Sequence, residues 1–437
     1  MNTSNKQNNS DYFNGGFAEI VSEPSEITFY YLRQWFSGKN SIGEAMDMLN
    51  LPYEEIPNSL LEMVDGELMV NLKIEEQTLY KNTLFSYAKQ NTPSDAPKLT
   101  VNWLKVLNPL TWLGTSKIVI AQSKWIANPT ETAQQAAKWV TEIPEVSTKD
   151  HMNAAELSVM LQTEVWPVVL SIGIVAEFYQ QYLSTQLKQS FKEVEPWIAE
   201  EISKKDWFFR SLCAQKDVKD KSLTLEEYIH TYGMRSDKDY ELTSPRWYEI
   251  PDEIKKRIDK YTIPEKNKAD NSAYESLPSK TKSTVDAYIK IQILRSEAKR
   301  KMLPYINLLR QKVAVGTKFS KPITVQTSEP KKNLETKKFG KGTPICSGVV
   351  SGICKQIISA SQELGDATIG IFPNASPEFA ILYPRCKGMI FLKGGQTSHG
   401  AIVAREFQIP ALIDNLASGI PDGVSVQIDG AKGEWQL

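Results

Sequence analysis

The stretch GGQTSHGAIVARE, from Gly394 to Glu406, decides how the C-terminal part of the chain folds. Before it stands the short apolar run GMIFL (388–392), which is typical of a buried strand. The second half, from Gly400 to Glu406, has the apolar spacing of a helix. The two glycines allow a tight turn and a close approach of the backbone to a bulky group. The pattern therefore predicts strand, turn and helix, with His399 at the start of the helix.

Short apolar runs bounded by glycine, proline or aspartate surround this stretch. Runs of this length that are rich in valine and isoleucine indicate strands. They predict a compact α/β unit over residues 342–437. The runs are GVVSGICKQI (348–357), ATIGIF (367–372), VSVQIDG (424–430) and EWQL (434–437).

The preceding residues, 25–317, have a mainly helical pattern. Residues 283–312 place apolar side chains three and four positions apart, and prolines divide the rest into shorter pieces. The most apolar run, 165–176, is shorter than the roughly 20 residues that a membrane span needs, so we expect a buried helix. Residues 318–341 are rich in lysine and predict a solvated linker, or alternatively a loop packed on one domain. Residues 1–24 are polar, lack a secretion signal and predict a flexible tail.

Composition excludes several classes of protein. The chain has 51 Lys and Arg against 52 Asp and Glu, so it lacks the positive charge of a general nucleic-acid binder. Its four cysteines form no C-x-x-C pair, which argues against a disulfide scaffold or a zinc site and favours a reducing, cytoplasmic location. With three histidines in the chain, we expect no metal centre built from several of them.

His399 is the first candidate for chemistry. Neutral imidazole is a good nucleophile near pH 7, because its ordinary pKa is about 6.5. Thr397 or Ser398 can cap the helix, whose free N–H groups, together with Arg405, would suit a phosphate. On these residues alone, a simple surface histidine at a helix start remains the alternative.

A second candidate lies at residues 232–247, where arginines, carboxylates and aromatic residues are concentrated. Arg235 and Arg246 could each hold a phosphoryl group or a carboxylate by two hydrogen bonds. Asp239 or Glu241 could accept a proton from an attacking hydroxyl or amine. The alternative is an internal network of ion pairs that braces a turn.

The sequence GGQTSHGAIVAREFQIPAL resembles the active-site signature of the phosphoenolpyruvate-utilising enzymes, which include phosphoenolpyruvate synthase and rifampicin phosphotransferase. The resemblance extends over 342–437 and implies a swivelling β/β/α phosphohistidine domain. It implies that His399 carries a phosphoryl group, with Thr397 and Ser398 beside it and Arg405 on the following helix. Gly394 and Gly395 would form the phosphate loop. Lys393 departs from the family pattern, and either a phosphate contact or a solvent-facing position suits it.

The segment 232–247 resembles, more loosely, the substrate-binding domain of the rifampicin phosphotransferase type, as does LRSEAKR (294–300). Met234 stands where that type more usually has histidine. The resemblance implies a largely α-helical substrate domain over 25–317, followed by the phosphohistidine domain. Its implied substrate-binding residues are Arg235, Asp239, Glu241, Arg246, Arg295 and Glu297.

The sequence shows neither a resemblance to the family's ATP-grasp domain nor a Walker-type phosphate loop. The resemblance therefore implies that a separate ATP-grasp protein charges His399, and that Mg²⁺ and ATP bind mainly to that partner. The acceptor would be a small molecule bound in the helical domain, with no nucleic acid and no membrane involved. Two alternatives stay open: an ATP-driven ligase that activates a carboxylate or carbonyl, and a non-catalytic relay or regulatory subunit.

Overall fold

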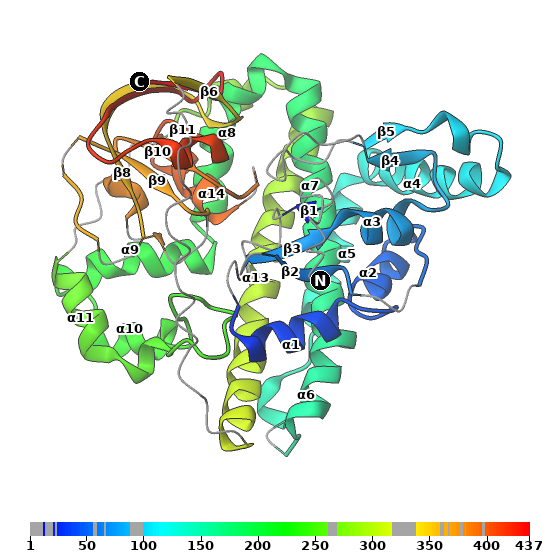
Figure 1. The fold of residues 1–437 in the computed structure, drawn as a ribbon, viewed down its shortest axis with the longest axis horizontal. Coiled ribbons are helices and arrows are strands. Elements are labelled where there is room, and N and C mark those ends of the chain that lie inside the picture. Colours follow the sequence, from blue (N-terminus) through cyan, green and yellow to red (C-terminus); the bar gives the residue numbers. More distant parts are fainter. Residues whose placement is uncertain are drawn as a thin grey trace, which may run out of the picture.

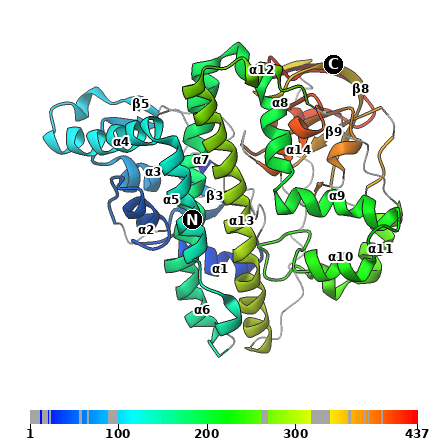
Figure 2. The ribbon, with the colours of Figure 1, turned by 180° about the vertical axis from the view of Figure 1, so that it is seen from behind.

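A computed structural model gives the fold shown in Figures 1 and 2. It describes residues 12–13, 21, 24–55, 59–64, 67–87, 99–149, 151–260, 269–316, 338–358, 362–365, 367–375, 379–380, 382–395 and 398–437. A helical region comes first, and a domain built on a mixed sheet follows, which confirms the fold class predicted from sequence.

The helical region is organised around two long helices, which pack against each other along the core (Figure 1). Capping side chains fix where several helices begin: Ser25 caps α1, and Thr224 and Glu227 form a capping box on α10. The helices are α1 (Glu26–Trp35), α2 (Ile42–Met48), α3 (Leu72–Glu75), α4 (Pro109–Ala127), α5 (Pro129–Glu142), α6 (Ala154–Met160), the long α7 (Trp166–Leu187), α8 (Gln189–Ser203), α9 (Trp207–Lys219), α10 (Leu225–Tyr232), α11 (Pro251–Lys260), α12 (Ser272–Glu275) and the long α13 (Ser279–Gly316).

Helix α7 contains the apolar run that the sequence singles out. The continuous helical stretch Ala154–Leu187 is long and apolar enough to cross a membrane, but 67% of its most apolar window is buried inside the protein. Trp166, Ile172 and Tyr179 lie in the same apolar core as residues of α13. The run therefore forms a buried core helix, and its burial rather than its length shows this.

The helical region also contains small antiparallel sheets. β1 (Tyr12–Phe13), β3 (Glu67–Asn71) and β2 (Leu61–Val64) pair in that order, and β4 (Phe85–Tyr87) pairs with β5 (Leu99–Val101). In Figure 1, β4, β5 and α4 project from the side opposite to the C-terminal domain. β1 corrects part of the predicted flexible tail, because Tyr12 is buried and its hydroxyl donates a hydrogen bond to Glu62.

The C-terminal domain is a mixed sheet with the strand order β6-β13-β12-β8-β9-β10-β11-β7. β8, β9, β10 and β11 run parallel, and the remaining pairs are antiparallel. Helix α14 (His399–Glu406) connects β10 to β11 and packs on the sheet. The strands are β6 (Phe339–Lys341), β7 (Thr343–Cys346), β8 (Val349–Gln356), β9 (Thr368–Phe372), β10 (Gly388–Phe391), β11 (Ala411–Ile413), β12 (Ser425–Asp429) and β13 (Glu434–Gln436).

The predicted linker, 318–341, lies outside the described residues except for its last four, of which Phe339–Lys341 form β6. The predicted strands and helix of the C-terminal unit correspond to β8, β9, β10, α14, β12 and β13. The C-terminal domain rests on the helical region: α14 lies beside α8, and residues of α9 join the domain's apolar core (Figures 1 and 2).

Candidate functional site

The turn between β10 and α14 places His399 at the first position of the helix. Ser398 is completely buried and caps α14, because its hydroxyl accepts a hydrogen bond from the N–H of Ala401 at 3.3 Å. Gly394 has a φ of +137°, and a side chain there would meet Ala375 at 2.9 Å. Thr397, predicted beside His399, lies outside the described residues.

The His399 ring is buried against the helical region on one edge. Its Nε2 atom is shielded from solvent and has no hydrogen-bond partner among the described residues, although the residue as a whole keeps some exposure. Desolvation, together with the positive charges of Arg235 and Lys299, lowers the pKa of His399 to about 3. The imidazole is therefore neutral at physiological pH, and it lies within electrostatic reach of cations from the helical region.

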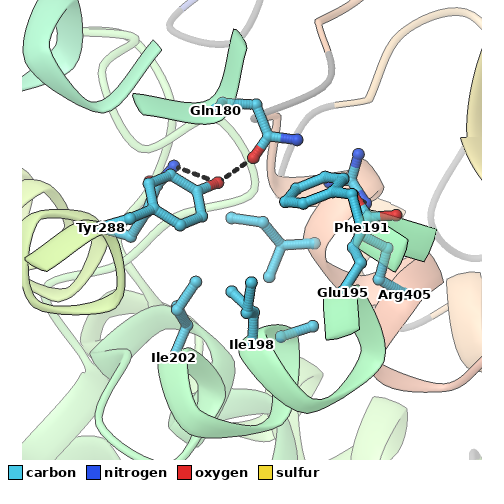
Figure 3. Close-up of a pocket in the computed structure, with 10 residues that line it drawn as sticks. Gln180, Phe191, Glu195, Ile198, Ile202, Tyr288 and Arg405 are labelled. Atoms are coloured by element: carbon cyan, nitrogen blue, oxygen red, sulfur yellow. Dashed lines mark hydrogen bonds and ion pairs between the residues drawn. The ribbon is translucent and has the colours of Figure 1, made fainter. Parts of the chain in front are cut away.

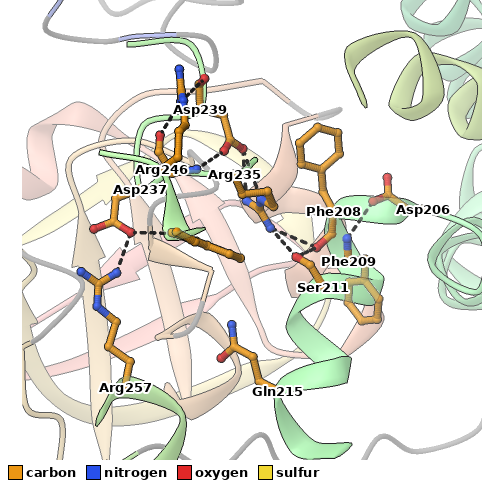
Figure 4. Close-up of polar contacts among 12 residues, drawn as sticks. Asp206, Phe208, Phe209, Ser211, Gln215, Arg235, Asp237, Asp239, Arg246 and Arg257 are labelled. Carbon is orange, nitrogen blue, oxygen red and sulfur yellow. Dashed lines mark hydrogen bonds and ion pairs between the residues drawn. The ribbon is translucent and has the colours of Figure 1, made fainter. Parts of the chain in front are cut away.

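Arg235 reaches His399 from a rigid setting. Its guanidinium pairs with Asp239 at 3.2 Å and donates hydrogen bonds to Ser211 and to the carbonyl oxygen of Phe208 (Figure 4). Its charged carbon also lies over the Phe208 and Trp247 rings, at 5.1 and 4.8 Å from their centroids. Sequence analysis singled out Arg235, and the structure brings it to the histidine across the domain interface.

Further residues, which were not predicted from the sequence, lie close to Arg235 and His399. Lys299 acts on His399 from α13, and the buried Asp206 lies near both Lys299 and Arg235. Burial raises the pKa of Asp206, whereas its contact with the N–H of Phe209 and the nearby Ser296 lower it. The hydroxyls of Ser296 and Tyr240 are buried without a geometrically sound hydrogen bond among the described residues.

Only some of these residues lie in a part of the sequence that pointed to a functional site. Ser296 and Lys299 are three residues apart and so share one face of α13, within the stretch LRSEAKR that carried the resemblance. Asp206 follows a pattern typical of a helix cap and gives no hint of a site. We name the group Asp206, Arg235, Tyr240, Ser296 and Lys299 the cationic cluster.

Two other predicted substrate residues, Glu241 and Arg246, make contacts inside the helical region. Glu241 is buried and accepts hydrogen bonds from Ser25 and Thr28 at the start of α1, at 2.6 and 2.7 Å. Arg246 donates to Ser236 at 3.0 Å and to the Asp239 carbonyl at 2.8 Å, and desolvation lowers its pKa. These contacts match the bracing network that the sequence left open as an alternative, and substrate binding by these residues stays a prediction.

Arg295 and Glu297 point in different directions along α13. Arg295 acts electrostatically on Tyr240, which belongs to the cationic cluster. Glu297 forms an ion pair with Arg300 on a partly exposed face of the helix. The structure therefore brings Arg295, and not Glu297, toward the candidate site.

Arg405 makes its contacts away from the His399 ring. Its Nε atom lies 2.7 Å from a carboxylate oxygen of Glu195 on α8 and donates a hydrogen bond to the carbonyl of Ile345 at 3.1 Å. Figure 3 shows Glu195 and Arg405 side by side at the edge of a pocket between the two domains. Lys393, which the sequence left between phosphate and solvent, pairs with Glu67 of β3.

Comparisons with known proteins agree with both halves of this picture. Residues 364–433 match the model of the PEP-utilising enzyme mobile domain, and residues 181–315 match the rifampicin phosphotransferase fourth domain. The two matches contain His399 and, on the other side of the interface, Asp206, Arg235 and Lys299.

Three curated relatives have similar sequences over shorter stretches. A rifampicin phosphotransferase of Bacillus subtilis is 33% identical over 99 residues, which is 22% of this chain and 11% of the relative. A probable phosphoenolpyruvate synthase of Staphylothermus marinus is 30% identical over 105 residues, 23% of this chain and 13% of the relative. A phosphoenolpyruvate-protein phosphotransferase of Mycoplasma genitalium is 47% identical over 49 residues, 11% of this chain and 9% of the relative.

The matched stretches thus span about a tenth of each relative's length. The strand-turn-helix around His399, the two matching family models and these relatives all point to one group of proteins. Over the matched residues, the chain carries a mobile domain of the phosphoenolpyruvate-utilising enzyme type and a helical region similar to the rifampicin phosphotransferase fourth domain.

Proposed function

We propose that this chain is a phosphotransferase subunit in which His399 carries a phosphoryl group to a small-molecule acceptor bound beside the cationic cluster. The observation that supports it most is the setting of His399 against Arg235 and Lys299. The same positive charges that disfavour a protonated imidazole favour an imidazole that carries an anionic phosphoryl group. One electrostatic arrangement thus suits both the nucleophile and its phosphorylated form.

Charging requires a different position of the domain. Nε2 is buried in the docked arrangement, so a phosphoryl donor cannot approach it in line. In the proposal the phosphohistidine domain leaves the helical region, and Nε2 attacks the phosphoryl group of ATP on a separate ATP-grasp protein. The N–P bond forms as the P–O bond to the nucleotide breaks.

Transfer then takes place against the helical region, with the phosphohistidine domain set back far enough for the phosphoryl group and the acceptor to lie between Nε2 and the cationic cluster. An acceptor hydroxyl attacks phosphorus, the N–P bond breaks, and its electron pair returns to Nε2 of His399. Arg235 and Lys299 stabilise the charge on the moving phosphoryl group. The Asp206 carboxylate accepts the proton that the hydroxyl loses, because burial makes it a stronger base than a solvated aspartate.

The donor set around His399 fits a phosphoryl group better than a metal ion. It offers two cations, while the carboxylate of Asp239 is already paired with Arg235. Mg²⁺ prefers several carboxylate and water oxygens. In the proposal, Mg²⁺ and ATP therefore bind to the partner, and the cytoplasm supplies both.

The test uses an extract of the native cells as the source of the partner. The chain and its His399→Asn variant are incubated with the extract and ATP labelled on its phosphates, then repurified under alkaline conditions. We expect an acid-labile, base-stable label on the unmodified chain, located at His399 by mass spectrometry. Label of the same stability on the variant would contradict the proposal, as would label that maps to another residue.

A further inference from the structure

The ion pair between Glu195 and Arg405 connects the two domains at a shielded position. Glu195 lies on α8 of the helical region, and Arg405 lies in the last turn of α14. Their side chains keep only 16% and 8% of their exposure, and 2.7 Å separates the carboxylate oxygen from Nε. Phe191, Ile198 and Ile402 line the same pocket, so apolar groups surround the pair (Figure 3).

A shielded ion pair selects one arrangement of the interface more than it stabilises the interface. Removing water from both charges is unfavourable and offsets much of their attraction, so the net stabilisation is modest. An unpaired charge at the same place would be strongly unfavourable. The pair therefore favours one arrangement of the interface over others in which Glu195 or Arg405 is buried alone.

The other interface contacts are less directional or more exposed. Phe209 of α9 packs against Phe407 with a ring distance of 5.9 Å, an apolar contact that tolerates sliding. Lys260 and Glu363 lie 3.1 Å apart, but their side chains are 47% and 82% exposed. Exposed pairs of this kind contribute little. Lys393 and Glu67 form a further pair of intermediate exposure.

The pair between Glu195 and Arg405 therefore holds the C-terminal end of α14. His399 begins the helix and faces Arg235 and Lys299, while Arg405 comes six residues later, about 9 Å along the axis, and meets Glu195. This pair, together with the packing of α14 beside α8, limits how far the helix can slide or rotate. Loss of the Glu195 contact would leave the His399 end free to tilt away from the cationic cluster.

We propose that Glu195 is a positioning residue, which holds Arg405 so that His399 docks with Nε2 sealed against the cationic cluster. Its importance for transfer rests on the proposed function. The docking itself does not, so it can be tested without any phosphoryl donor or acceptor.

The experiment measures how fast diethyl pyrocarbonate modifies each histidine of the full chain, followed by mass spectrometry. His151 and His230 are exposed in the structure and serve as internal references. In the unmodified chain we expect His399 to react far more slowly than either. In Glu195→Gln we expect the rate at His399 to rise about tenfold or more, because the charged partner of Arg405 is lost.

Three further variants make the result specific. Glu193→Gln changes an exposed carboxylate on the same helix and should leave the rate at His399 unchanged. Glu195→Asp keeps the charge on a shorter side chain and should give an intermediate rate. The exchange Glu195→Arg with Arg405→Glu should restore protection relative to Glu195→Arg alone.

Protection of His399 that persists in both Glu195→Gln and Glu195→Arg would overturn the proposal. Equal acceleration of all three histidines would indicate general unfolding of that variant, and the Glu195→Asp result then decides. The assay reports access to His399 and not phosphoryl transfer. A failure to find phosphohistidine would therefore sink the proposed function while leaving this test intact.

Discussion

At the scale of single residues, the proposed phosphoryl transfer depends on a neutral imidazole at His399. Burial has the largest effect on the pKa of His399, and the charges of Arg235 and Lys299 act in the same direction. Asp206 supplies the opposite charge nearby, and burial raises its pKa. A neutral imidazole with cations nearby would suit the proposed transfer of an anionic phosphoryl group.

Replacing Lys299 tests this electrostatic arrangement directly. In Lys299→Met we expect the pKa of His399 to rise above its value of about 3, because one of the two cations that disfavour imidazolium is gone. With three histidines in the chain, a pH titration of labelled imidazoles by NMR can follow the ring. Lys290→Met, an exposed position on the same helix, is the matched control and should leave the titration of His399 as it was.

The sequence identified His399 and Arg235, but not Lys299 or Asp206. A nucleophile in a glycine-rich turn before a helix is visible locally, and so is an arginine among carboxylates. Lys299 and Asp206 look like an ordinary helix lysine and an ordinary cap until two domains meet. Their selection requires the interface, which no local pattern encodes.

At the scale of elements, the segment 232–247 works as a brace between distant helices. Glu241 joins the start of α1 to this segment, because it accepts hydrogen bonds from the backbone and hydroxyl of Ser25, from Thr28 and from Thr243. Leu242 donates its N–H to Thr28 at 3.0 Å. These contacts connect parts of the chain more than 200 residues apart.

Glu241→Gln should weaken this brace without disturbing His399. An amide places a donor where the structure needs an acceptor, so charge-assisted hydrogen bonds are lost in a buried site. We expect the free energy of unfolding to fall by about 2 kcal/mol in a urea titration. The same change at Glu193 should have almost no effect. A loss of substrate binding at unchanged stability would instead favour the predicted role of Glu241 as a substrate ligand.

Elements were predicted better than their contacts. The strands of the C-terminal domain and α14 follow from short-range apolar patterns and from Ser398 as a cap. β1 was missed because two residues in a polar segment give no periodic signal, and the buried Tyr12 holds them to β3. The docking of α14 against α8 depends on Glu195, which carries no signal of its own in the sequence.

At the scale of the whole molecule, the proposed movement of the C-terminal domain would couple its docking to the protonation of His399. In the docked arrangement the pKa of His399 is about 3, whereas a solvent-exposed histidine has its ordinary value near 6.5. The undocked form therefore binds a proton more readily between these values. By linkage, docking is fully present above about pH 6.5 and is lost progressively as the pH falls toward 3.

Small-angle X-ray scattering between pH 7 and pH 5 can measure this loss. We expect the docking equilibrium to weaken by about tenfold for each pH unit below 6.5, which enlarges the average particle. Asp206, whose pKa is raised by burial, opposes the effect. His399→Asn should abolish the part that belongs to the imidazole. An identical pH response in that variant would show that other groups govern docking.

The shared apolar cluster of the two domains has a thermal consequence. Phe209 and Leu212 of α9 belong to the same buried apolar cluster as Phe379 and Ala404 of the C-terminal domain. Undocking of that domain would therefore expose apolar side chains of both domains to water. Attraction of this kind fades on cooling. At low temperature the imidazole of His399 should therefore be exposed to solvent for a larger share of the time.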